Sequence, residues 1–334
     1  MLRAIVVGLG LTASVGAWAQ APGAYAPPRL ADGHPDLQGV WGNSPIATPL
    51  ETNPALGDKP VVSQAEARAL ADTFLANARK IAALQVDLPD QMDLAVVRGE
   101  HRTRLIVEPA NGRIPFSVSA RKAVSDWSAQ FFRVKNGLVA DNPESLALSD
   151  RCISLGGQPP MHPSLARQIV QSPGYIVIHM EGYNETRVVR MNGVHQPNAI
   201  RTRLGDSVGR WVGDVLVVET TAFRLDEPYY VSMAPNQNPP FVVGPTSKVV
   251  ERFTSVSADE LTYAFTIEDP DIYENPWRGE YALSRVSDQR VWESACHEGN
   301  HGVANTLAGA RMSDTLRTEI TAGEPRSKAN NAQR

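Results

Sequence analysis

The second half of the chain is dominated by short segments in which apolar and polar residues alternate. From residue 151 onward the apolar pattern has a period of two, which is typical of β-strands with one buried face. Strands are predicted at 167–171, 175–181, 185–191, 209–212, 215–221, 248–256, 261–269, 280–286 and 290–296. Most are separated by only a few residues, which favours consecutive antiparallel hairpins.

A meander of antiparallel strands either closes as a barrel or folds as a sandwich, and closure removes exposed strand edges. We therefore expect a mainly β domain over residues 151–320. A lipocalin-like barrel is one such arrangement, and the Gly39-Val40-Trp41 string, which is typical of the first strand of lipocalins, is compatible with it.

Residues 20–150 are predicted to form an arm with two helices and a hairpin that pack on the β domain. Ser63 and Glu66 fit a capping box, so the first helix should begin there and run to about residue 84. The second helix is expected over 119–134, and the hairpin over 104–107 and 114–116. A short helix near 305–314 and a flexible polar tail, 321–334, should follow the β domain.

Residues 1–19 have the features of a secretory signal peptide. Arg3 supplies the positive charge, residues 4–16 are apolar but too few to cross a bilayer, and Ala17-Trp18-Ala19 fits a cleavage site. No later run of about 18 apolar residues occurs, so no membrane span is predicted. We expect a periplasmic or secreted protein.

The two cysteines bear on the cellular compartment of the protein, and its charge bears on the kind of partner it binds. The chain has two cysteines, Cys152 and Cys296, and an exported protein most simply joins them in one disulfide, with a reactive or metal-bound thiol as the alternative. The formal net charge of −4 is spread along the chain without a basic stripe, which argues against a nucleic-acid partner.

Several long strings resemble one large family of exported proteobacterial and acidobacterial proteins. They are DGHPDLQGVW, RLIVEPANGRIP, QIVQSPGYIVI, GDSVGRWVGDVLVVETTAF, ERFTSVSADELTYAFTIEDPDIYENPW, ACHEGNH and LAGAR. The resemblance implies an architecture and a compartment, and it brings no catalytic residues with it. Relatives often have tyrosine at the position of His301, which argues against an indispensable role for this histidine.

The predicted hairpin at 175–191 carries the most suggestive charges. If 182–184 form its turn, alternation places Tyr175, His179, Glu181 and Arg187 on one face, with His179 across from Arg187. A carboxylate, an imidazole and a guanidinium within reach of each other could perform acid–base chemistry on a bound molecule. Surface ion pairing explains the same residues and is the more common outcome.

The string from His297 to His301 has the H-E-x-x-H form of a zinc protease motif. That motif requires a helix, because histidines four positions apart must share a face to bind one metal ion. Gly299 and Asn300 are poor helix formers, so we expect a loop and no metal. If a metal is bound, His297 and His301 are the expected ligands; otherwise His297 is a candidate proton partner of Glu181.

A long apolar connection and several aromatic residues are compatible with a ligand cavity inside the barrel. Residues 223–245 are too long for a turn and are predicted to form a lid. The expected substrate-binding residues are Tyr175, Trp211, Tyr229, Tyr230, Phe241, Trp277 and Glu293.

Three hypotheses about function follow from these patterns. The first is an exported enzyme, a lyase, isomerase or hydrolase, that acts on a small organic molecule without a cofactor and uses Glu181, His179, Arg187 and His297. The second is a periplasmic small-molecule binding or carrier protein with the same cavity. The third is a metal-dependent hydrolase that uses the histidine string.

Overall fold

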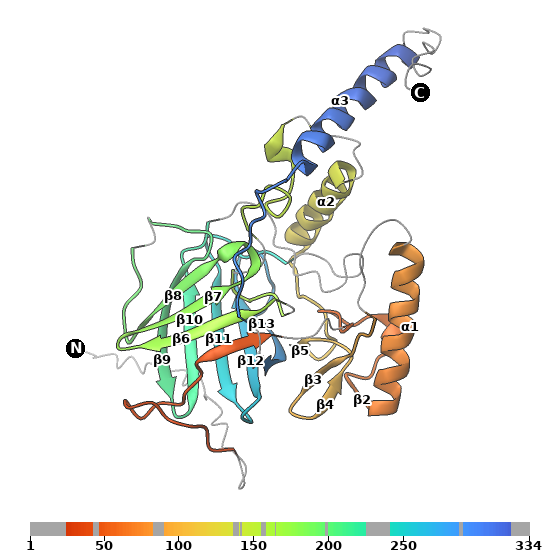
Figure 1. Cartoon of the computed structure of the whole chain (residues 1–334). Helices are drawn as coiled ribbons and strands as arrows, with labels where there is room; N and C mark the ends of the chain where they lie inside the picture. The colour runs from red at the N-terminus through yellow and green to blue at the C-terminus, as the bar shows by residue number, and fades with distance from the viewer. Residues whose placement is uncertain are drawn as a thin grey trace, which may run out of the picture.

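Figure 1 shows the computed structural model of the chain, a barrel of strands with helices at one side. The structure describes residues 25–42, 47–82, 90–135, 140, 142–154, 158–163, 165–197, 200–224, 241–286 and 290–321. The predicted signal peptide, 1–19, and nearly all of the predicted tail, 322–334, lie outside the described residues.

Nine strands of the described chain close the barrel. They are β1 (Gly39–Gly42), β6 (Arg167–Ser172), β7 (Tyr175–Met180), β8 (Thr186–Met191), β9 (Asp206–Val212), β10 (Val215–Thr221), β11 (Lys248–Ser255), β12 (Glu260–Glu268) and β13 (Trp277–Arg285). Strand β1 closes the ring because it pairs with both β6 and β13. The prediction of a mainly β fold closed as a barrel is confirmed.

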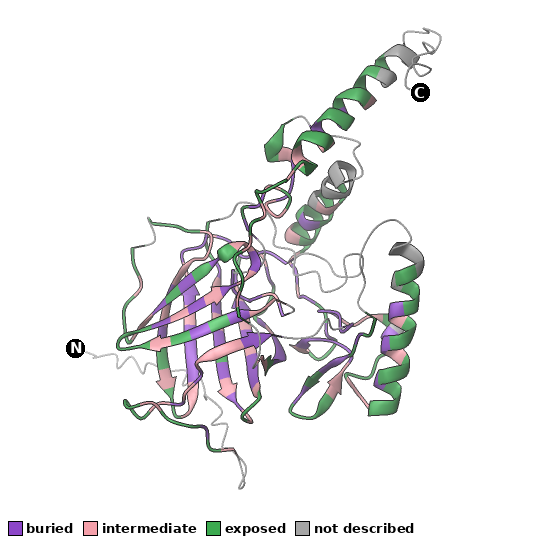
Figure 2. Cartoon of the chain, viewed as in Figure 1, coloured by how far each residue is buried: buried purple, intermediate pink, exposed green. Residues whose placement is uncertain are grey.

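Several barrel strands bury alternate residues, as their sequence period requires. In β11, Val249, Glu251 and Phe253 are buried while the residues between them are more exposed, and Figure 2 shows the same alternation in neighbouring strands. Most buried apolar side chains of the barrel belong to one large cluster. The interior of the barrel is therefore its hydrophobic core.

One pairing departs from the predicted antiparallel meander. Strands β8 and β9 run parallel, with Val189 opposite Ser207, whereas the other neighbouring barrel strands are antiparallel. Parallel neighbours need a crossover connection of a dozen or more residues, and residues 192–205 supply it. This crossover also distinguishes the barrel from the up-and-down arrangement of lipocalins.

The arm contributes strands to the barrel sheet as well as a small sheet of its own. The predicted hairpin over 104–116 is wrong: β5 (Ile106–Glu108) pairs with β13, and Phe116 bridges Tyr273. The small sheet contains β2 (Val61–Val62), β3 (Ala95–Val97) and β4 (Glu100–Arg102). Both segments found partners distant in sequence, which local patterns do not specify.

Three α-helices of the described residues flank the barrel. They are α1 (Gln64–Ala82), α2 (Val118–Lys135) and α3 (Gly302–Thr321), with short 3-10 turns at Pro54–Leu56, Pro143–Ser145 and Gly182–Asn184. The capping box of α1 is confirmed, since the Glu66 carboxylate accepts from the Ser63 backbone N–H at 2.8 Å. None of the described helices is long and apolar enough to cross a membrane.

The segment between the barrel and α3 differs from the predicted strand at 290–296. The expected strand at 290–296 is absent from the described residues of that range, which form an irregular segment leading to Cys296. Strand β13 already has β12, β5 and β1 as partners, so this segment finds no free edge there.

Candidate functional site

Large side chains fill the barrel, where the sequence predicted a ligand cavity. Trp277, Tyr263 and Tyr281 are each at most 1% exposed, and Tyr263 packs against Tyr281 with ring centroids 4.9 Å apart. Phe241, from the predicted lid, is also buried and meets Trp277 edge-on. Trp277 and Phe241 are therefore core residues.

Two charged residues that point into the barrel, Arg187 and Glu251, neutralise each other. The Arg187 guanidinium forms a bidentate ion pair with the Glu251 carboxylate, and the Tyr263 hydroxyl donates to Glu251 Oε1 at 2.8 Å. Burial opposes the charge of Arg187, but Glu251 outweighs it and raises the pKa of the guanidinium. Burial, followed by the Glu251 charge, raises the pKa of Tyr263 well above 10. The group is a buried structural network.

The predicted convergence of His179, Glu181 and Arg187 is wrong. In the observed register His179 is opposite Thr186, and Arg187 is opposite Ile178. The connection between the paired residues Met180 and Glu185 has four residues, 181–184, one more than predicted, and a shift of one residue turns a strand over. Arg187 thus faces the core, while His179 lies outside and contacts the Thr186 hydroxyl at 2.8 Å.

The remaining predicted site residues are dispersed over the molecule. Tyr175 is half exposed on the outer face of β7, and Trp211 stacks on His34 with centroids 4.9 Å apart. Glu293 is exposed on the segment before Cys296. Tyr229 and Tyr230 lie outside the described residues. The structure therefore does not bring the predicted substrate-binding set together.

The string from His297 to His301 forms a turn, as expected. It precedes α3, and the Asn300 side chain donates to the Asp150 backbone carbonyl at 3.0 Å. The predicted disulfide between Cys152 and Cys296 is confirmed and holds this turn against residues 149–152. Among the described residues, no three His, Cys, Asp or Glu side chains are placed to hold a metal ion.

A carboxylate–imidazole–carboxylate cluster lies on the outside of the barrel and was not predicted. His195 Nδ1 is 2.9 Å from Asp206 Oδ2, and His195 Nε2 is 3.3 Å from Glu219 Oε1. Arg190 binds both oxygens of Asp206, and the Gln196 backbone N–H donates to it as well. His195 and Gln196 lie in the 192–205 crossover and bind carboxylates of β9 and β10. The cluster therefore anchors the crossover to these strands.

This cluster predicts a pH-dependent contribution to stability. Burial opposes the charge of Asp206, but bonds from Arg190, Gln196 and His195 outweigh it and lower the pKa of the carboxyl from 3.8 to about 2. An Asp206→Asn variant should lose about 1–2 kcal/mol of unfolding free energy at pH 7. Because the pKa is lowered on folding, the stabilisation by Asp206 is present above pH 3.8 and is lost as the pH falls toward 2. The difference in unfolding free energy between the wild type and Asp206→Asn should therefore shrink over that pH interval.

The measurement is urea unfolding of the wild type and Asp206→Asn at pH 7, 5 and 3. Asp271→Asn, which removes the same charge from an exposed side chain, is the matched control and should change stability by less than about 0.5 kcal/mol. A deficit of Asp206→Asn that stays constant down to pH 3 would contradict the ionic role of Asp206.

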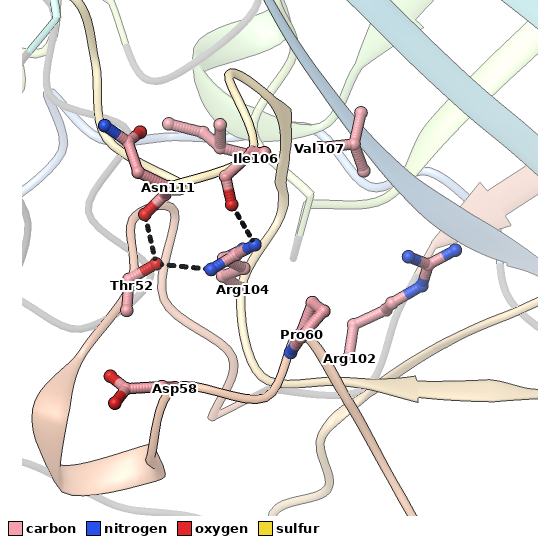
Figure 3. Close-up of a pocket in the computed structure, with 9 residues that line it drawn as sticks. Thr52, Asp58, Pro60, Arg102, Arg104, Ile106, Val107 and Asn111 are labelled. Atoms are coloured by element: carbon pink, nitrogen blue, oxygen red, sulfur yellow. Dashed lines mark hydrogen bonds between the residues drawn. The ribbon is translucent and has the colours of Figure 1, made fainter.

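A cavity lies within the arm beside strand β5, which pairs with barrel strand β13, and we call it the junction cavity. Its volume is about 630 Å³, within the range of small-molecule sites. It lies beside β5, between residues 52–60 of the arm and the turn after β5 (Figure 3). Its walls are formed by Thr52, Asp58, Pro60, Arg102, Arg104, Ile106, Val107, Ala110 and Asn111.

Arg104 is fixed on the wall of the junction cavity. Its guanidinium donates to Thr52 Oγ1 at 2.8 Å and to the Ala110 backbone carbonyl at 2.6 Å (Figure 3). Gly112, at φ +64°, lies against it, and a Cβ there would be 2.4 Å from both Thr52 Oγ1 and Arg104 Cδ. Glycine is required at this turn because any side chain would displace the guanidinium.

The charge of Arg104 has no carboxylate partner among the described residues. Arg104 is only 9% exposed, and its hydrogen bonds go to a hydroxyl and a carbonyl. Two carboxylates on neighbouring segments are bound elsewhere: Glu51 accepts from the Ile114 N–H, and Glu280 pairs with Arg102. Buried charges are normally paired, so an unpaired guanidinium on a cavity wall suits an anionic ligand.

Arg102 has a different role at the same cavity. It pairs with Glu100 at 2.7 Å and with Glu280 of β13 at 3.0 Å, and Arg98 binds both oxygens of Glu280. These contacts tie the β3–β4 hairpin to the barrel and so position one wall of the cavity. Sequence reasoning missed the site because Arg104 was read as the start of a hairpin.

Comparisons with protein-family models, with curated proteins and with solved structures find no match to this chain.

Proposed function

We propose that this chain is an exported small-molecule-binding protein whose junction cavity takes up an organic carboxylate. The observation that carries the proposal is the buried Arg104 guanidinium, which lies on the cavity wall without a carboxylate partner among the described residues. The signal-peptide pattern at 1–19 and the disulfide support export.

The rest of the cavity wall supports binding in preference to catalysis. Pro60, Ile106, Val107 and Ala110 offer an apolar surface for the body of the ligand. The described lining includes no histidine and a single carboxylate, so it lacks the acid–base pair that proton-transfer catalysis requires. A carboxylate with a short hydrocarbon chain fits these walls.

The test is isothermal titration of the disulfide-bonded protein with caproate, and with caproamide as the uncharged counterpart. Caproate should bind and caproamide should not. Arg104→Gln should weaken caproate binding about tenfold to hundredfold, because a hydrogen bond to a charged group is lost. Arg104→Lys keeps the charge but lacks the planar guanidinium group. Its affinity for caproate should lie between those of the wild type and Arg104→Gln.

Arg210→Gln is the matched control, because Arg210 is exposed on β9 and its replacement removes the same charge. This variant should bind caproate as the wild type does. The proposal is overturned if caproate fails to bind below about 10 mM, or if caproamide or Arg104→Gln gives the same Kd as caproate with the wild type. Circular dichroism of each variant checks that the fold is retained.

A further inference from the structure

The junction cavity carries two opposite charges that do not pair with each other. Besides Arg104, its wall includes Asp58, an exposed carboxylate with no ion pair or hydrogen bond to another described residue. The two side chains come from different segments of the arm that border the cavity, Asp58 from residues 52–60 and Arg104 from the segment before β5 (Figure 3). The other charged residue of the wall, Arg102, is already paired with Glu100 and Glu280.

This charge distribution disfavours a plain anion. A carboxylate ligand would gain from Arg104 but would be repelled by Asp58 on the same wall, because like charges in a partly enclosed site oppose binding. A ligand that also carries a cation turns that repulsion into attraction. The cavity contributes one free positive and one free negative charge, so a ligand without net charge matches it.

We infer that the ligand is zwitterionic, with a carboxylate for Arg104, an ammonium group for Asp58 and a hydrocarbon part for the apolar residues of the wall. Amino acids and short peptides are the chemical class that has these three parts. The inference rests on the proposed function, and it names the ligand class of the same site. Pro60, Ile106 and Val107 supply the apolar contacts.

Three probes with the same six-carbon chain test the inference. Caproate has the carboxylate alone, norleucine adds an ammonium group beside the carboxylate, and ε-aminocaproate adds it at the far end of the chain. At least one of the two zwitterions should bind the wild type about twofold to fivefold more tightly than caproate, the gain expected for an exposed ion pair.

The Asp58→Asn variant identifies the source of that gain. It should bind both zwitterions no better than caproate, and it should bind caproate slightly more tightly than the wild type because a repulsive charge is removed. Asp271→Asn, which loses an exposed charge outside the cavity, should retain the wild-type preference for the zwitterion.

The outcomes separate this inference from the proposed function. If caproate binds through Arg104 but neither zwitterion binds more tightly, the ligand is a plain anion and the inference is wrong while the proposed function stands. A zwitterion preference that survives Asp58→Asn also overturns the inference. If caproate does not bind below about 10 mM, the proposed function itself fails.

Discussion

Replacing Cys152 and Cys296 together by serine is expected to lower the free energy of unfolding by about 5 kcal/mol. The two residues are 144 positions apart, so the disulfide removes much of the conformational entropy of the unfolded chain. It also holds the turn before α3. In α3, Leu307 and Ala310 belong to a small apolar cluster that includes Ala140 and Leu146. Urea unfolding of the oxidised wild type and the double variant measures the loss.

Two controls separate the covalent link from local contacts. The wild type treated with dithiothreitol should unfold at the same urea concentration as the double variant. Asn300→Ala, which removes the contacts with Cys152 Sγ and the Asp150 carbonyl but keeps the disulfide, should cost only about 1 kcal/mol. A loss below about 1 kcal/mol in the double variant would contradict a stabilising role for the link.

The local features of the fold could be predicted from the sequence because they depend on neighbouring residues. Alternation over 248–256 predicts β11 to within one residue, since each strand must bury one face. Ser63 and Glu66 predict the start of α1 because their reciprocal bonds lie within one helical turn. The barrel could be predicted as one of two arrangements, a barrel or a sandwich, because closing a long meander removes its exposed strand edges.

Long-range pairings could not be predicted in the same way. The parallel β8–β9 pair depends on where the 192–205 crossover returns, and the short strand β5 joins β13, far along the chain. No local pattern distinguishes these partners from a hairpin. The predicted strand at 290–296 failed for the same reason, because strand propensity does not guarantee a free edge.

The candidate site shows the same division. The face of Arg187 depends on whether the connection before β8 has three or four residues, and the sequence allows either. That Arg104 is unpaired depends on Glu280 pairing with Arg98 and Arg102, which are brought together only by the fold. A charge within a β segment is visible in the sequence, but the lack of a partner is not.

A second large effect is expected at the ion pair inside the barrel. Glu251→Gln should lower the free energy of unfolding by about 3–5 kcal/mol, because it leaves the Arg187 charge buried without a counter-charge. Arg187→Met should cost a similar amount by stranding Glu251. The matched control is Glu268→Gln, which breaks the half-exposed pair with Lys248 on the neighbouring strands and should cost at most about 1 kcal/mol.

The double variant Arg187→Met with Glu251→Leu decides what this pair does. If the pair is structural, removing both charges should cost far less than the sum of the single changes, because no buried charge remains. Tyr263 would still lose the acceptor of its hydroxyl, so a residual loss of about 1 kcal/mol is expected. Caproate binding should be unchanged, since neither residue lines the junction cavity. Urea unfolding measures the stability of the four proteins, and additive losses would contradict the coupling.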